Sequence, residues 1–253
     1  MNKLQDRVAL ITGAGGGFGE GMALHFAELG AQVVVADLRA DAAQQVASAI
    51  EAAGGQAMPV QVDVTLNASV EAMVAATVKR YGRLDILVNN AGTTHKNQPL
   101  LDTDEASFDR VYATNVKSIF LGARHAVPVF RRQGGGVIIN IASTAGPRPR
   151  PGLVWYAGTK GAAITLTKGM AAELAPEHIR VNAINPVMGE TGLLADFLPG
   201  EDSEAVRAKI IATIPLGRLS RPLDIAKAAA FLASDEAEFI TGVALEVDGG
   251  RCI

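Results

Sequence analysis

Tyr156 and Lys160 are the residues whose types and spacing best suit proton transfer. They stand one helical turn apart at the start of an Ala-rich run, and residues four apart in a helix project from the same face. A free tyrosine has a pKa of about 10, and a fixed ammonium group beside it lowers that pKa. The pair predicts a general acid/base acting on a carbinol or carbonyl oxygen. Because such spacing also arises by chance, the interpretation depends on the rest of the chain.

A glycine-rich turn near the N-terminus predicts a dinucleotide site. The segment 12–19 reads TGAGGGFG and connects an apolar strand pattern to a helix pattern. Glycines at such a turn let the backbone approach a pyrophosphate, and the helix N-terminus offers unpaired N–H groups. The expected cofactor-binding residues of this turn are Gly13, Gly16, Gly17, Phe18 and Gly19.

Asp37 closes the second strand pattern and favours NAD over NADP. A carboxylate at this place accepts hydrogen bonds from the ribose hydroxyls and repels a 2′-phosphate. Gly16 offers no basic side chain to such a phosphate, and Arg39 is the one feature that speaks for it. We therefore expect NAD as the cofactor, with NADP as the alternative.

The elements that must position these residues alternate between short apolar runs and longer Ala-rich patterns. This alternation predicts an α/β fold, a doubly wound parallel sheet of the Rossmann type with about seven strands, in a single domain over residues 1–253. Strands are expected at 8–12, 32–37, 57–63, 84–89, 136–142, 179–185 and 243–247. Helices are expected near 18–29, 40–53, 67–81, 104–132, 156–175 and 222–233. The interval 187–221 interrupts the rhythm and is expected to be an inserted loop that covers the substrate.

Polar and small residues follow several of the expected strands. Parallel strands bring their carboxyl ends to one edge of a sheet, where ligands bind. Asp63 could accept from an adenine amino group, and Ser143 could donate to a substrate oxygen. Each residue taken alone fits ordinary turn chemistry equally well. The expected cofactor contacts at these strand ends are Asp63, Val64, Asn89, Ala91 and Gly92.

Composition narrows the classes of function. The 253 residues are 49% hydrophobic with a net charge of −3, and no basic run suggests a nucleic-acid partner. No apolar stretch approaches the ~20 residues of a membrane span. The short apolar segment at the N-terminus and the single cysteine, Cys252, predict a cytoplasmic protein without an internal disulfide. The four histidines are dispersed, so no metal site is expected.

Taken together, these motifs resemble the short-chain dehydrogenase/reductase family along essentially the whole chain. The resemblance is carried by TGxxxGxG at 12–19, NNAG at 89–92, Asn115, Ser143 and YxxxK at 156–160. It implies that Tyr156 is the catalytic acid/base and that Ser143 holds the substrate oxygen. It further implies that Lys160 binds the nicotinamide ribose and lowers the tyrosine pKa, and that Asn115 anchors a water that relays protons.

The resemblance also places Pro186 and Thr191 at the nicotinamide end of the cofactor. Two departures from the family pattern stand out: Val187 replaces a glycine after the proline, and Gly158-Thr159 replaces Ala-Ser before the lysine. A branched side chain at 187 restricts the backbone that seats the carboxamide. Related enzymes usually form tetramers through the long helices near 104–132 and 156–175 and through the C-terminal strand, so a homotetramer is expected.

The predicted activity is NAD-dependent interconversion of a secondary alcohol and a ketone, with a small-molecule substrate. A 3-oxoacyl-thioester reductase using NADPH and a sugar 1-dehydrogenase remain alternatives, as do a sugar-nucleotide epimerase or dehydratase and a non-catalytic dinucleotide-binding protein. The substrate is left open. Arg148 and Arg150, in a proline-rich loop, either attract an anionic group or are solvated surface charges. Trp155 either walls the pocket or packs in the core.

Overall fold

The computed structural model describes residues 3–192, 194–198 and 202–253, and these form a parallel sheet with helices on both faces. The strand order is β3-β2-β1-β4-β5-β6-β7, and every neighbouring pair is parallel. The strands are β1 (Val8–Thr12), β2 (Gln32–Asp37), β3 (Gln56–Gln61), β4 (Ile86–Asn89), β5 (Gly136–Ile141), β6 (Ile179–Pro186) and β7 (Ala244–Val247). The predicted doubly wound, seven-stranded sheet is confirmed.

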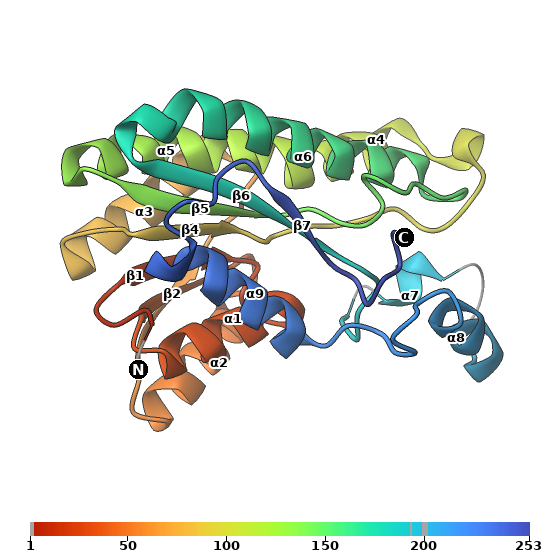
Figure 1. Ribbon diagram of the computed structural model, residues 1–253, viewed down its shortest axis with the longest axis horizontal. Coiled ribbons are helices and arrows are strands. Elements are labelled where there is room, and N and C mark those ends of the chain that lie inside the picture. Colours follow the sequence, from red (N-terminus) through yellow and green to blue (C-terminus); the bar gives the residue numbers. More distant parts are fainter. Residues whose placement is uncertain (1–2, 193, 199–201) are drawn as a thin grey trace.

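Figure 1 shows the helices in two layers, with α1, α2 and α9 on one face of the sheet and α3 to α6 on the other. The α-helices are α1 (Gly17–Glu28), α2 (Ala40–Ala52), α3 (Asn67–Tyr81), α4 (Glu105–Tyr112), α5 (Ser118–Gln133), α6 (Val154–Leu174), α7 (Leu194–Phe197), α8 (Glu204–Ile211) and α9 (Pro222–Ala233). Short 3-10 turns are η1 (Leu100–Asp102), η3 (Ala175–Glu177) and η4 (Asp235–Ala237), and η2 (Ala113–Lys117) is π-helical.

The continuous apolar strands follow from this architecture, because a parallel sheet covered on both faces buries both sides of each strand. In β1, Ala9 and Ile11 face the core under α1, α2 and α9. Leu10, between them, faces the opposite core under α3 and α5. Successive side chains of a strand point to opposite faces, so a short Val/Ile/Leu run serves both cores.

The helix expected over 104–132 is divided in the structure. α4 ends at Tyr112, a π-helical turn spans Ala113–Lys117, and α5 begins at Ser118. Wider π-helical turns inside helices are frequent at functional sites. Here the turn contains the buried Asn115. Pro128, a residue type that often ends a helix, lies inside α5 without ending it.

The interval 187–221 forms a small substructure beyond the strand ends. It contains α7 and α8 and its own apolar cluster, which includes Val187, Ile214 and Leu219. A parallel bridge between Gly189 and Ser220 joins its two ends. Residues 193 and 199–201 of the interval lie outside the described residues. Figure 1 shows α7 and α8 past the end of the sheet where the chain also terminates.

Candidate active site

A cavity of about 450 Å³ opens at the carboxyl ends of β1, β4, β5 and β6. This is where the strand order reverses, because β1 is followed in space by β4, and open α/β sheets bind ligands at such a point. Three of the four expected catalytic residues line it, namely Ser143, Tyr156 and Lys160. The expected cofactor residues that line it are Gly13, Gly16, Gly17, Phe18, Asp37, Ala91, Gly92, Pro186 and Thr191.

Tyr156 stands in the first turn of α6 with its side chain at the cavity and 8% of its surface exposed. Burial raises the pKa of its phenol to about 12, and a hydrogen bond with Ser143 and the charge of Arg150 only partly oppose this. The prediction that the pKa of Tyr156 is lowered is therefore wrong for the protein without a bound cofactor, in which this pKa is raised. Desolvation of the phenolate outweighs the nearby cations, so the phenol carries its proton at neutral pH.

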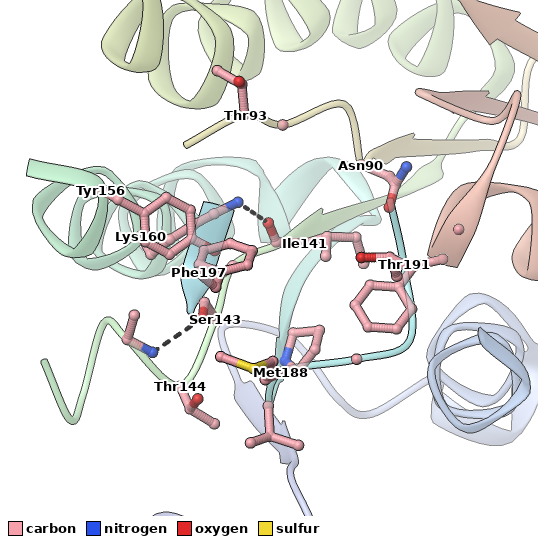
Figure 2. A pocket seen from close by; sticks show the side chains of 18 of the residues that line it. Asn90, Thr93, Ile141, Ser143, Thr144, Tyr156, Lys160, Met188, Thr191 and Phe197 are labelled. Atoms are coloured by element: carbon pink, nitrogen blue, oxygen red, sulfur yellow. Dashed lines mark hydrogen bonds between the residues drawn. The ribbon is translucent and has the colours of Figure 1, made fainter. Parts of the chain in front are cut away.

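Lys160 lies beside Tyr156 on the same helix face, with its ammonium nitrogen 5.7 Å from the centre of the tyrosine ring (Figure 2). Its Nζ donates to the carbonyl oxygen of Ile141, the last residue of β5, at 2.8 Å. Burial lowers the pKa of Lys160 to about 8. The predicted i, i+4 neighbourhood is present, and the lysine is anchored to the sheet rather than to the phenol.

Replacing this buried lysine is expected to stabilise the free protein. A pKa moved from 10.5 to about 8 corresponds to about 3 kcal/mol, from which the loss of the Ile141 hydrogen bond subtracts roughly 1 kcal/mol. Lys160→Met should therefore raise the free energy of unfolding at pH 7 by about 2 kcal/mol. From pH 8 to 10 the unfolded lysine holds a proton that the folded one releases, so wild-type stability should rise with pH.

The measurement is urea unfolding across this pH range. In Lys160→Met the rise between pH 8 and 10 should disappear. Lys168→Met, on the exposed face of the same helix, is the matched control and should keep it. A variant at 160 that is less stable than the wild type at pH 7 would contradict the assigned cost of burial.

Ser143 stands two residues after the end of β5 and faces the cavity (Figure 2). Its hydroxyl accepts a hydrogen bond from the backbone N–H of Ala145 at 3.1 Å, which fixes the oxygen in place. It also lies close enough to the Tyr156 phenol to lower the pKa of the phenol. The serine and tyrosine hydroxyls are thus neighbours in one cavity, as the binding of a single substrate oxygen requires.

Asn115 does not line the cavity but ties its walls together from behind. Its amide accepts from the Thr93 N–H at 2.9 Å and donates to the Thr93 carbonyl at 2.9 Å. The same amide donates to the Thr159 hydroxyl at 3.0 Å, which in turn donates to the carbonyl oxygen of Tyr156. Asn115 therefore joins the loop after β4 to the first turn of α6. Its expected role in anchoring a water stays a prediction.

The glycine turn between β1 and α1 is held by Asn90. The Asn90 amide donates to the carbonyl oxygens of Thr12 at 2.8 Å and Gly13 at 3.0 Å. Gly13 and Gly17 have φ of 61° and 57°, the left-handed region that glycine adopts without strain. No side chain caps α1 at Gly16. The helix N-terminus therefore faces the cavity open, as binding of a pyrophosphate requires.

Gly19, expected to contact the cofactor, instead lies under the turn. A Cβ at this position would stand 2.1 Å from the carbonyl oxygen of Gly13 and 2.6 Å from the Asn90 amide nitrogen. Gly19→Ala is therefore expected to displace the turn, to destabilise the protein by about 1 to 3 kcal/mol, and to weaken NADH binding. Thermal unfolding and calorimetric titration with NADH measure both effects.

Gly169→Ala is the matched control, because this glycine in α6 has open space where the Cβ would go. An alanine there should stabilise the helix by up to about 1 kcal/mol. NADH binding should be unchanged in this control. Normal NADH affinity in Gly19→Ala would show that the turn tolerates the methyl group and that packing beneath it does not shape the site.

Asp37 ends β2 at the floor of the cavity, and its carboxylate is held by two backbone groups. One oxygen accepts from the Gly15 N–H at 2.9 Å, and the other accepts from the Arg39 N–H at 3.0 Å. The Arg39 guanidinium is largely exposed and stands 3.8 Å from the carboxylate, also on the cavity lining. The cavity lining therefore contains both Asp37, which favours NAD, and Arg39, which favours NADP.

Three other expected cofactor residues lie away from the cavity lining. Asn89 points into the sheet, where its amide donates to Asn140 at 2.8 Å. Asp63 accepts from the backbone N–H and the hydroxyl of Thr65, which makes it a turn-forming residue. Val64 is buried in the core under α3 and α5. The backbone after Asn89, at Asn90 to Thr93, supplies the lining instead.

Trp155 packs away from the cavity. Its indole nitrogen donates to the carbonyl oxygen of Leu100 at 3.1 Å, and its ring meets Phe108 edge to face at 5.6 Å. His95 is buried: its Nδ1 is 2.8 Å from the Lys96 carbonyl oxygen, and its Nε2 accepts from the Tyr156 backbone N–H at 3.4 Å. The imidazole thus caps the first turn of α6.

The interval 187–221 contributes the outer wall of the cavity. Phe197 of α7 meets the Tyr156 ring edge to face at 5.1 Å (Figure 2). Thr191 lies against the glycine turn, since a Cβ on Gly17 would be 3.2 Å from its methyl carbon. Sequence reasoning missed Met188 and Phe197 here, because apolar residues in an irregular segment carry no periodic signal. That the segment covers a substrate stays a prediction.

Within the described ranges, no group of three or more His, Cys, Asp or Glu residues is arranged to hold a metal ion. No helix in the part of the chain that the structure describes is both long and apolar enough to cross a membrane.

Comparisons with known proteins agree with this geometry. A family model described as enoyl-(acyl carrier protein) reductase matches residues 13–251. The 4-formylbenzenesulfonate dehydrogenase of Comamonas testosteroni is 51% identical over 99% of both chains. The 2,5-dichloro-2,5-cyclohexadiene-1,4-diol dehydrogenase of Sphingobium indicum is 41% identical over 98% of this chain and 97% of its own.

A solved structure is equally similar. The 3-ketoacyl-(acyl-carrier-protein) reductase of Brucella melitensis, complexed with NADH, superimposes with a TM-score of 0.93 at 48% identity, covering 99% of this chain and 100% of that one. The chain therefore belongs to the short-chain dehydrogenase/reductase family of oxidoreductases.

Proposed function

We propose that the chain interconverts a secondary alcohol and a ketone, with NAD as the hydride carrier and Tyr156 as the general acid/base. The observation that carries the proposal is the convergence of the Ser143 and Tyr156 hydroxyls in the cavity that also contains the glycine turn and Asp37. A proton donor and a dinucleotide seat in one cavity are what such a reaction needs.

Ser143 and Tyr156 have different roles in the proposed proton transfer. Ser143 holds the substrate oxygen, and Tyr156, protonated at neutral pH, gives its proton to that oxygen when a ketone is reduced. In alcohol oxidation the phenol must first lose its proton, which costs more because it is buried. The Ser143 hydroxyl and the charge of Arg150 favour that loss.

The residues that line the cavity suit a dinucleotide. The open N-terminus of α1 at Gly16 and Gly17 would hold the pyrophosphate, Asp37 the adenosine ribose, and Lys160 the second ribose. When bound, the nicotinamide ring supplies the site that accepts or gives the hydride. Ala91 and Gly92 leave room on the wall of this cavity, and a Cβ on Gly92 would come within 3.6 Å of the Lys160 nitrogen.

A ring-bearing substrate is favoured over a linear one. Apolar residues form part of the cavity wall, with Leu153, Met188, Phe197 and Ile210 among them. Flat or cyclic carbon skeletons fill such a wall well. The names of the Comamonas and Sphingobium relatives, a benzaldehyde derivative and a cyclohexadiene diol, point in the same direction.

The test is a panel of alcohols and ketones with NAD and NADP, followed by the absorbance of the reduced nicotinamide. The panel includes 1-phenylethanol, cyclohexanol, a linear secondary alcohol and a sugar hemiacetal. We expect the cyclic and aromatic members to react with NAD. Purified protein that binds NADH and oxidises or reduces no member of the panel would contradict the proposal.

Reduction of a 3-oxoacyl thioester is the second candidate, favoured by the 48% identity to the Brucella reductase. Acetoacetyl N-acetylcysteamine with NADH and NADPH tests it. Turnover of this thioester at a higher kcat/KM than any cyclic ketone would replace the first candidate by the second.

We also propose assembly into a homotetramer. Large apolar side chains are exposed on helices and strands that related enzymes use for contact, including Phe120 on α5, Leu166 on α6 and Leu245 on β7. Exposed apolar groups gathered on regular elements are typical of association surfaces. Light scattering measures the mass, and a monomer at micromolar concentration would contradict the proposal.

A further inference from the structure

Besides Arg39, three arginines line the cavity that contains Tyr156. Arg148 and Arg150 belong to the proline-rich loop after β5, and Arg251 belongs to the segment after β7. All three line the same cavity as the phenol. A guanidinium nitrogen of Arg148 donates to the carbonyl oxygen of Arg251, so the two segments are joined at the rim.

None of these three guanidinium groups is paired with an acid among the described residues. Other arginines of the chain, such as Arg83, Arg131 and Arg218, form ion pairs at 2.5 to 2.6 Å. Ion pairs of Arg148, Arg150 and Arg251 are absent from the ranges 3–192, 194–198 and 202–253. The cations therefore face the cavity without a neutralising partner from the described chain.

Arg150 is the member of the set in the least favourable surroundings. It is half-buried, and its pKa is lowered first by burial and then by the charge of Arg251. A charged group that is partly desolvated beside a like charge gains most from an anion. Arg150 and Tyr156 line the same cavity, and the charge of the guanidinium lowers the pKa of the phenol.

The surroundings of the arginines define the shape of the ligand. Phe197 and Leu153 line the same cavity and offer apolar contact, while Arg150 and Arg251 offer planar donors that suit a carboxylate or sulfonate. A ligand that makes both the apolar contacts and the hydrogen bonds to the arginines is a small molecule with a ring and a carboxylate or sulfonate group.

We propose that Arg150, supported by Arg251 and Arg148, binds a carboxylate or sulfonate group of the substrate whose carbinol faces Tyr156. This inference rests on the proposed hydride transfer and adds the charge of the substrate to it. The proline-rich loop then acts as the element that selects anionic cyclic or aromatic alcohols over neutral ones.

The kinetic test compares isosteric alcohols that differ in charge alone. The first pair is 4-(1-hydroxyethyl)benzoate and 4-(1-hydroxyethyl)benzamide, and the second is 4-hydroxycyclohexanecarboxylate and its carboxamide, each with NAD. Wild-type protein should prefer the anion in kcat/KM. Arg150→Gln should reduce that preference, the ratio of the two kcat/KM values, by about ten- to a hundredfold, the effect of losing a charge-assisted hydrogen bond.

Two further variants separate a specific contact from a general field. Arg150→Lys keeps the charge but loses the planar pair of donors, so it should retain part of the preference. Lys79→Gln removes one positive charge from the exposed face of α3, outside the cavity, and should retain all of it. Loss of the preference in Lys79→Gln equal to that in Arg150→Gln would overturn the assignment to this loop.

A binding measurement keeps the inference separate from the chemistry. Calorimetry with the unreactive probes 4-ethylbenzoate and 4-ethylbenzamide, on NADH-loaded protein, should show tighter binding of the anion in the wild type and its loss in Arg150→Gln. If no alcohol is turned over but this result holds, the hydride-transfer proposal fails and the oxyanion site stands. Equal binding of both probes by the wild type overturns the oxyanion site, and weaker NADH binding by Arg150→Gln assigns the arginine to the cofactor instead.

Discussion

Tyr156→Phe should lower kcat for alcohol oxidation by about 10²- to 10⁴-fold, the contribution typical of a positioned acid/base. The phenyl ring keeps its contact with Phe197 and its place in the first turn of α6. The variant loses only the hydroxyl, and with it the hydrogen bond to Ser143. Binding of NADH should remain within a few-fold of the wild type, because the glycine turn and Asp37 are untouched.

Tyr81→Phe is the matched control for this experiment. Its hydroxyl is buried without a hydrogen-bond partner among the described residues, on α3 outside the cavity. Removing it should leave kcat unchanged and stability equal or slightly higher. Turnover in Tyr156→Phe within tenfold of the wild type would refute a proton-transfer role for the phenol.

Asp37→Ser should reduce the preference for NAD over NADP by at least about a hundredfold. The carboxylate that would repel a 2′-phosphate is gone, and like charges held together cost several kcal/mol. Arg39, on the same wall of the cavity, becomes free to face that phosphate. The measurement is the ratio of kcat/KM for the two cofactors with one alcohol at saturating concentration.

The serine hydroxyl can replace only one of the two hydrogen bonds that Asp37 accepts from Gly15 and Arg39, so thermal unfolding must accompany the kinetics. Asp41→Ser is the control, since it removes a charge from the exposed first turn of α2 nearby. It should leave the cofactor preference within twofold. An unchanged preference for NAD over NADP in Asp37→Ser would mean that the Asp37 carboxylate does not contact the adenosine ribose.

The fold could be predicted closely because its signals are local. The runs 8–12 and 32–37 coincide with β1 and β2, since strands buried on both faces are continuously apolar and end at glycine or acid. The division of 104–132 into α4, a π-helical turn and α5 could not be predicted. The wider turn depends on Asn115 reaching Thr93 on another element, and no local pattern records that contact.

The sequence predicts which residues line the site better than it predicts what each of them contacts. Tyr156, Lys160 and Ser143 reach one cavity because strand ends and a helix turn fix their direction. Asn89 and Asp63 also lie at strand ends, yet their side chains hydrogen-bond to Asn140 and Thr65. The pleat of the strand and the geometry of the turn decide where these side chains point. The tyrosine pKa depends on burial, which spacing alone does not supply.

Trp155 gives the protein a built-in optical reporter. It is the single tryptophan of the sequence, it precedes the reactive tyrosine directly, and its indole is fixed against Phe108 and the Leu100 carbonyl oxygen. Its emission therefore reports on one place, the beginning of the helix that carries the phenol. Energy transfer from this indole to a reduced nicotinamide would register occupancy of the neighbouring cleft without any added dye.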